Sequence, residues 1–181
     1  MDHRDVAVKV FLSGVLRSER PYLHRVLVTV RGWREFCASR RAADALLRGP
    51  AGATEVGHLR WWLEHVATVA DAGARGYPIR FVAYEDVLAD PGGTVADVLD
   101  WLGVSGDVGA GADAVSPALR TQVQPPAPPG MPAAWVEGFD ALYSALRTCP
   151  DDALGFGGLH AEVVEAARDY GPRTDPWAAR E

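Results

Sequence analysis

Arg31 and Ser39 are the two residues of this chain whose types and spacing could bind a ligand. They stand eight positions apart, on either side of the point where the apolar, β-branched run Val26–Val30 gives way to a helical stretch. A guanidinium at the end of a strand and a hydroxyl about two helical turns later can converge on one anion. Because Arg offers paired planar donors that match phosphate, the pair predicts a phosphate site. The structural alternative is an ion pair beside a solvated hydroxyl, and Arg34 and Arg40 are expected to point elsewhere.

The sequence around this pair resembles the sulfotransferases that use 3′-phosphoadenosine 5′-phosphosulfate. In that family a strand runs into an Arg-Asn/Asp-Pro segment, and the next helix carries a Ser eight residues after the Arg. Here Gly32 and Trp33 replace the Asn/Asp-Pro. A longer match begins at the Trp pair 61–62, continues through residues 77–91 with Tyr-Glu-Asp and Asp-Pro segments, and closes at residues 98–104.

This resemblance covers roughly residues 5–104, extends more loosely to about residue 147, and implies both a fold and an activity. The implied fold is a P-loop-NTPase-like α/β domain, a parallel sheet flanked by helices. The implied activity is transfer of a sulfuryl group from 3′-phosphoadenosine 5′-phosphosulfate to a hydroxyl or amine of a small molecule or glycan, without a metal. Arg31 and Ser39 would bind the 3′-phosphate of the donor. The acceptor would contact the variable stretch 103–132 or a segment that precedes this chain.

The family's Gly-rich loop, which binds the 5′-phosphosulfate, is not recognisable here. Residues 11–18 match its opening superficially, but a Glu-Arg-Pro run from Glu19 to Pro21 stands where the family has Gly-Thr-Thr. Glu19 would repel an anion, and Pro21 has no N–H to donate. Only seven residues separate Ser18 from Val26, whereas a crossover between parallel strands needs a dozen or more.

A second alignment places Lys9 in a later strand of the family. Lys9 lies 22 residues before Arg31, the spacing expected of the strand that ends in Lys-Thr-His, so the chain would begin downstream of the phosphate loop. Phe11 then stands where many members have a catalytic His, and the catalytic base stays unassigned. The alternative function is an inactive or truncated remnant that serves as a nucleotide-binding or interaction module. A nucleoside-triphosphate enzyme is less favoured, because the second strand ends in Arg31 instead of a Mg²⁺-binding carboxylate.

Composition indicates one soluble domain over residues 1–181. Hydrophobic content is 48%, charged content is 23% and the net charge is −6 at pH 7, so we expect neither nucleic acid nor membrane as a partner. The chain lacks a signal-like apolar start and an apolar run of ~20 residues, which predicts a cytoplasmic protein. Cys37 and Cys149 are too few for a disulfide framework, and Cys37 is expected to be buried.

Hydrophobic periodicity predicts strands that alternate with helices. Strands are expected at residues 6–11, 26–30 and 79–84, with the second buried on both faces. Helices are expected at residues 33–47, 55–72, 95–102 (with Thr94 as N-cap), 132–147 and 156–169, with a Gly- and Pro-rich excursion at 105–131 and a frayed tail. Three strands would leave a sheet edge exposed, so we expect a missing N-terminal segment or pairing with another copy.

Apolar residues recur at helical spacing and define the expected core faces. They are Phe36, Cys37, Ala43 and Leu46 on the first long helix, Leu59, Trp62, Leu63, Val66 and Val69 on the second, and Trp135, Phe139, Leu142, Tyr143 and Leu146 on the helix from residue 132.

Four further residues could serve the site or only the fold. Trp33 could stack on an adenine ring or pack in the core, and both interpretations stay open. Glu85 is expected to bond neighbouring backbone. His58 and His65 could align on one helix, but without a third ligand no metal site is predicted.

Overall fold

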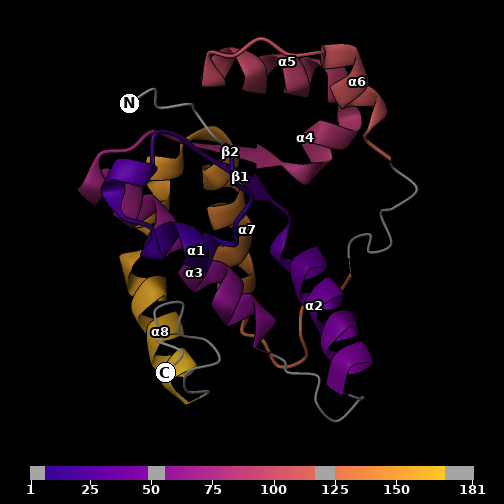
Figure 1. Ribbon diagram of the computed structural model, residues 1–181. Helices are drawn as coiled ribbons and strands as arrows, with labels where there is room; N and C mark the ends of the chain where they lie inside the picture. Colours follow the sequence, from indigo (N-terminus) through magenta and orange to yellow (C-terminus); the bar gives the residue numbers. More distant parts are fainter. Residues whose placement is uncertain (1–6, 49–55, 117–124, 170–181) are drawn as a thin grey trace.

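The structure, a computed structural model, describes residues 7–48, 56–116 and 125–169 (Figure 1). Its elements in chain order are α1 (Leu12–Arg17), η1 (Arg20–Tyr22), β1 (Val26–Val30), α2 (Trp33–Arg48), α3 (Gly57–Arg75), β2 (Ile79–Ala83), α4 (Tyr84–Ala89), α5 (Pro91–Leu102), α6 (Val108–Asp113), α7 (Ala133–Thr148), η4 (Pro150–Gly155) and α8 (Gly157–Arg168). The long helices therefore lie close to their predicted bounds. The expected tail beyond residue 169 lies outside the described residues.

The sheet consists of β1 and β2, which pair in parallel with Val26 opposite Ile79 and Val30 opposite Ala83. Helices α2 and α3 form the crossover between the strands, as a parallel pair requires. A parallel sheet flanked by helices, the coarse α/β expectation, is confirmed for the described residues. The sheet of the described residues has two strands, so the finer expectation of a P-loop-NTPase-like fold stays a prediction.

The predicted first strand is wrong over the residues described. Residues 7–11 have no regular secondary structure, and Val8 and Phe11 are 71% and 85% exposed. Residue 6 lies outside the described part. β-branched residues favour a strand only where a half-buried pleated surface receives them. In this segment the apolar side chains meet solvent instead.

Strand β1 is buried on one face, which corrects the expectation of two buried faces. Val26, Val28 and Val30 point into the core, while Leu27 and Thr29 alternate with them and are exposed. The inner face packs on the helical layer of α3 and α7. On the other side of the sheet stand α5 and α6 (Figure 1).

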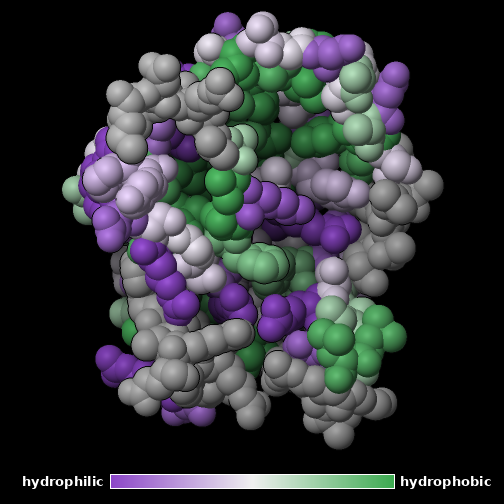
Figure 2. Space-filling view, in the orientation of Figure 1, coloured by the Kyte–Doolittle hydropathy of each residue, from purple (hydrophilic) through white to green (hydrophobic). Residues whose placement is uncertain are grey.

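Helix α5 covers the outer face of the sheet only loosely. It has no buried residue, and Figure 2 shows apolar atoms gathered beneath it, facing the sheet. Arg80 of β2 donates to the Asp97 carbonyl at 3.1 Å, and Arg25 lies over the Trp101 ring. Asp90, and not Thr94 as predicted, caps the helix, because its Oδ1 accepts from the Gly93 N–H at 2.9 Å.

The core centres on α3 and α7. The predicted apolar faces of both helices are confirmed, because their central residues are at most 9% exposed: Leu59, Trp62, Leu63, Val66 and Val69 on α3, and Phe139, Leu142 and Leu146 on α7. Aromatic rings fill the space between them, and the ring centroids of Trp62 and Phe139 are 4.7 Å apart. Trp135 and Tyr143 are half-buried at the edge of this cluster.

The apolar face predicted for α2 reaches the core in the first half of the helix, at Phe36 and Cys37, and fails in the second half. Leu46 is 87% exposed and Ala43 is exposed, whereas Trp33 and Cys37 are buried. The helix packs against the start of α3 at Gly57. A Cβ at that glycine would lie 3.5 Å from the Cys37 Cα, in ordinary van der Waals contact, so the two helices are close neighbours at this point.

Thiol labelling should separate the two cysteines. Cys37 is 8% exposed, as predicted, and burial raises the pKa of its thiol to about 12, although Arg41 acts in the opposite direction. Cys149 is exposed at the end of α7. Because the thiolate is the reactive form, we expect an aromatic disulfide reagent at pH 8 to label one thiol per native chain and two after unfolding. Rapid labelling of native Cys149→Ser would contradict this prediction.

Candidate functional site

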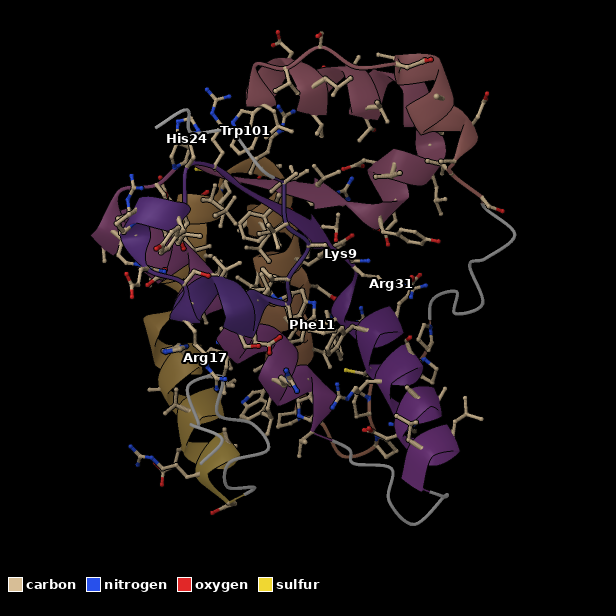
Figure 3. All side chains as sticks on the ribbon, viewed as in Figure 1. Lys9, Phe11, Arg17, His24, Arg31 and Trp101 are labelled. Carbon is tan, nitrogen blue, oxygen red and sulfur yellow. The ribbon has the colours of Figure 1, made fainter. Side chains whose placement is uncertain are left out.

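The candidate site lies where both strands end. β1 passes through Arg31 and Gly32 into α2, and β2 passes directly into α4, which begins at Tyr84. Since the strands are parallel and in register, their carboxyl ends meet at one edge of the sheet, which is where open α/β sheets bind ligands. Figure 3 labels Arg31 at this edge and Trp101 near the opposite end of β1.

Arg31 is held by groups from three helices. Its Nε donates to Glu35 Oε2 of α2 at 2.9 Å, and its Cζ lies 4.9 Å from the centroid of the Tyr84 ring of α4. Its backbone carbonyl accepts from Trp61 Nε1 of α3 at 3.0 Å. Among the described residues, neither terminal nitrogen of the Arg31 guanidinium has a hydrogen-bond partner. The paired donors of the side chain are therefore available to a ligand.

Ser39 and Arg31 line the same cavity, which has a volume of about 180 Å³; the other lining residues are Phe36, Arg40 and Ala43. Serine and threonine within helices often bond the carbonyl four residues back. Thr68 does so at 2.6 Å and Thr148 at 3.1 Å. For Ser39, the described part of the chain shows no such bond. Its half-buried hydroxyl can therefore donate into the cavity.

Of the two neighbouring arginines expected to point elsewhere, one lines this cavity. Arg40 contributes to its wall, and its Nε lies 3.4 Å from Asp44 Oδ2. The expectation fails for Arg40 because Phe36, four residues before it, and Ala43, three residues after it, share its face of α2 and line the same cavity. Arg34 does lie elsewhere, with its two terminal nitrogens on the Asp140 carboxylate at 2.6 and 2.9 Å.

A second, larger cleft of about 500 Å³ lies on the other side of the strand-to-helix turn; its lining includes Gly32, Arg34, Glu35, Glu85, Pro125, Asp140 and Tyr143. The Tyr143 hydroxyl of α7 donates to Glu85 Oε2, a long-range contact that the sequence did not predict. Burial, reinforced by this hydrogen bond, raises the pKa of Tyr143. The expected bond between Glu85 and neighbouring backbone stays a prediction. No local pattern pointed to Tyr143, which the helical periodicity placed on a core face.

Trp33 belongs to the core and is not free to stack on a ligand. It is 1% exposed, its ring lies 5.3 Å from Phe139, and its Nε1 donates to Asp140 Oδ1 at 2.7 Å. Burial works against ionisation of Asp140, but hydrogen bonds from Arg34 and Trp33 outweigh it and hold the pKa of Asp140 below its usual value. Asp140 therefore fixes the first turn of α2 against α7.

The histidines of α3 are packed among aromatic rings. His65 Nδ1 donates to the Trp61 carbonyl at 2.6 Å, and burial lowers the pKa of His65 to about 4. His58 lies against Trp135 and Phe139, with ring centroids 6.4 and 6.0 Å away. Because Trp61 also bonds the Arg31 carbonyl, His65 supports the candidate site from within the core.

The segment that superficially matches a phosphate loop presents carbonyl groups to a cation. Residues 12–17 form the short helix α1, and Pro21 lies in η1. Arg75 of α3 donates to the carbonyls of Ser18 and Val15. A phosphate cradle requires backbone N–H groups that converge on an anion. This turn binds a guanidinium instead.

Within the described residues, no helix has both the length and the apolar character needed to cross a membrane. Comparison of the chain with protein-family models, with curated proteins and with solved structures finds no match. A function is therefore inferred from the cavity at Arg31, the cleft beside it and the sequence motifs around them.

Proposed function

We propose that this chain is a sulfotransferase-like protein that binds 3′-phosphoadenosine 5′-phosphosulfate and directs its sulfuryl group to a hydroxyl or amine acceptor. The observation that carries the proposal is that Arg31, whose terminal nitrogens have no hydrogen bond among the described residues, lines the same cavity as Ser39. A guanidinium fork and a neutral donor suit the 3′-phosphate. The sequence motifs at residues 28–39 and 77–91 support the same assignment.

In the proposed reaction the acceptor oxygen or nitrogen forms a bond to sulfur while the bond from sulfur to the 5′-phosphate oxygen breaks. The products are the sulfated acceptor and adenosine 3′,5′-bisphosphate, and the acceptor proton passes to solvent or to a base. Positioning and neutralisation of charge dominate such transfers, as in phosphoryl transfer. The cleft beside Gly32 suits the acceptor, because Pro125, in the stretch expected to contact it, lines this cleft.

The alternative is a module that binds the nucleotide without catalysis, and two observations favour it. The turn after α1 offers carbonyls to Arg75 where a phosphate loop would offer N–H groups. In the second alignment, which places the phosphate loop upstream of this chain, Phe11 stands at the position of the family's catalytic His and is 85% exposed. Nucleotide binding is common to both functions, so it is the property to test first.

Calorimetry with adenosine 3′,5′-bisphosphate and adenosine 5′-monophosphate tests the site. We expect the wild type to prefer the bisphosphate roughly tenfold or more, because charge-assisted hydrogen bonds to the extra phosphate are lost with the monophosphate. Arg31→Ala should lose most of this preference, and Ser39→Ala should lose less because it removes one neutral donor. Arg168→Ala is the matched control, since this arginine is exposed on α8.

Equal affinity of the wild type for the two nucleotides, or an unchanged preference in Arg31→Ala, would exclude the proposed site. If the preference is present, release of adenosine 3′,5′-bisphosphate from the donor in the presence of phenol and amine acceptors separates the two functions. Turnover supports the transferase. Binding without turnover supports the nucleotide-binding module.

A further inference from the structure

The guanidinium of Arg31 is fixed in orientation as well as in position. Its Nε bonds the Glu35 carboxylate, which is 4% exposed and therefore cannot swing toward solvent. One face of the guanidinium lies over the Tyr84 ring. Tyr84 is the first residue of α4 and follows β2 without an intervening loop, so the sheet determines where its ring stands.

Other stacked arginines in the described residues use their terminal nitrogens within the protein. Arg34, which lies 4.4 Å from the Trp33 centroid, gives both to Asp140. Arg75, over Tyr77, gives its own to Asp71 and to backbone carbonyls. Arg25 and Arg147 each give one terminal nitrogen to a protein oxygen. Among these stacked arginines of the described residues, Arg31 leaves both terminal nitrogens without a hydrogen bond, and Arg31 lines a cavity.

We infer that Tyr84 and Glu35 are positioning residues that orient the Arg31 fork toward the 3′-phosphate and so determine donor specificity. This inference rests on the proposed function. An arginine side chain has many rotamers, and a fork makes two parallel hydrogen bonds only when its plane meets the phosphate oxygens correctly. Glu35 fixes the Nε edge, Tyr84 fixes the plane, and the terminal nitrogens are left to the ligand.

Three substitutions at the site separate orientation from charge, and a fourth elsewhere is the control. Tyr84→Leu removes the stacked ring but keeps bulk, so we expect the preference for adenosine 3′,5′-bisphosphate over the monophosphate to fall roughly fivefold. Tyr84→Phe keeps the ring and should retain the wild-type preference. Arg31→Lys keeps the positive charge but lacks the fork, and should lose most of the preference. Tyr22→Leu is the matched control, because Tyr22 is 81% exposed on η1.

Calorimetry with the two nucleotides on each variant decides the inference, with thermal melts to establish that each variant is folded. A folded Tyr84→Leu with wild-type preference overturns the positioning role, as does an equal loss in Tyr84→Phe and Tyr84→Leu. If Tyr84→Leu does not fold, Arg31→Lys decides, and retention of the preference would show that charge alone suffices. A wild type without any preference for the bisphosphate overturns the proposed function itself. If the preference is lost in Arg31→Ala and kept in Tyr84→Leu, only the present inference is overturned.

Discussion

Phe139→Ala should destabilise the protein by about 3–5 kcal/mol, the range found when a fully buried aromatic side chain is removed. Phe139 is 0% exposed and its ring lies among those of Trp33, Trp61 and Trp62, at centroid distances of 5.3, 6.1 and 4.7 Å. These neighbours come from α2 and α3 and are held by hydrogen bonds, so they cannot collapse fully into the space left by the ring. Urea unfolding at pH 7 measures the effect as a lower midpoint with an unchanged slope.

Phe11→Ala is the matched control for this prediction. The same atoms are removed from a side chain that is 85% exposed, so the free energy of unfolding should change by less than about 0.5 kcal/mol. A loss below about 1 kcal/mol for Phe139→Ala, or equal losses for the two variants, would show that the aromatic cluster between α3 and α7 is not the main core.

The elements best predicted from the sequence are those whose burial follows their own periodicity. Helices α3 and α7 are long, and each carries an apolar face that packs on the other elements, so spacing alone located both. Helix α2 shows where this reasoning fails. Its core face includes the buried Glu35 and Asp44 while Leu46 is exposed, because polar contacts at the candidate site compete with the apolar stripe.

The strand predicted over residues 7–11 is wrong for another reason. Its β-branched residues satisfy every local criterion for a strand, yet a strand also needs a neighbour that accepts its backbone hydrogen bonds. The sequence of the segment does not indicate whether such a neighbouring strand exists. Its secondary structure therefore depends on the rest of the sheet.

The candidate site also contains residues that the sequence could predict and one that it could not. Arg31 and Ser39 line one cavity, as their eight-residue spacing predicted. The spacing was sufficient because strand and helix geometry determine where a residue at the strand end and one about two helical turns later lie. Glu35 lies four residues after Arg31 on a helix, a spacing that indicates an ion pair. Tyr84 could have been found from the parallel register, since it follows the residue paired with Val30. Tyr143 carries no such signal, because α7 approaches from a distant part of the chain.

Protonation of His65 should make the protein less stable in acid. In the folded state burial lowers the pKa of His65 from 6.5 to about 4, so the folded protein binds fewer protons than the unfolded chain between these values. The stabilising contribution is complete above pH 6.5 and is lost progressively as the pH falls toward 4. The gap between the two pKa values corresponds to about 3 kcal/mol.

A His65→Gln variant isolates this contribution from that of the carboxylates, which titrate in both proteins. Its amide can donate to the Trp61 carbonyl as His65 does, but it carries no proton equilibrium in this range. The variant should be less stable than the wild type at pH 7, because Gln replaces an aromatic ring that lies 4.6 Å from the Trp61 ring. Between pH 6.5 and pH 4, the wild type should lose about 3 kcal/mol more than the variant. Urea unfolding across this range measures both curves.

His24→Gln is the matched control, because the same exchange is made at an exposed position outside the core that holds His65. Parallel curves for the wild type and His65→Gln would mean that the folded protein accommodates the imidazolium, and would contradict a neutral His65 in the core. The protonation of His65 should also affect the candidate site. Trp61 bonds both the His65 ring and the Arg31 carbonyl, so a charge on His65 would act on the residue that holds Arg31 in place. The preference for adenosine 3′,5′-bisphosphate should therefore fall in the wild type as the pH approaches 4, and fall less in His65→Gln.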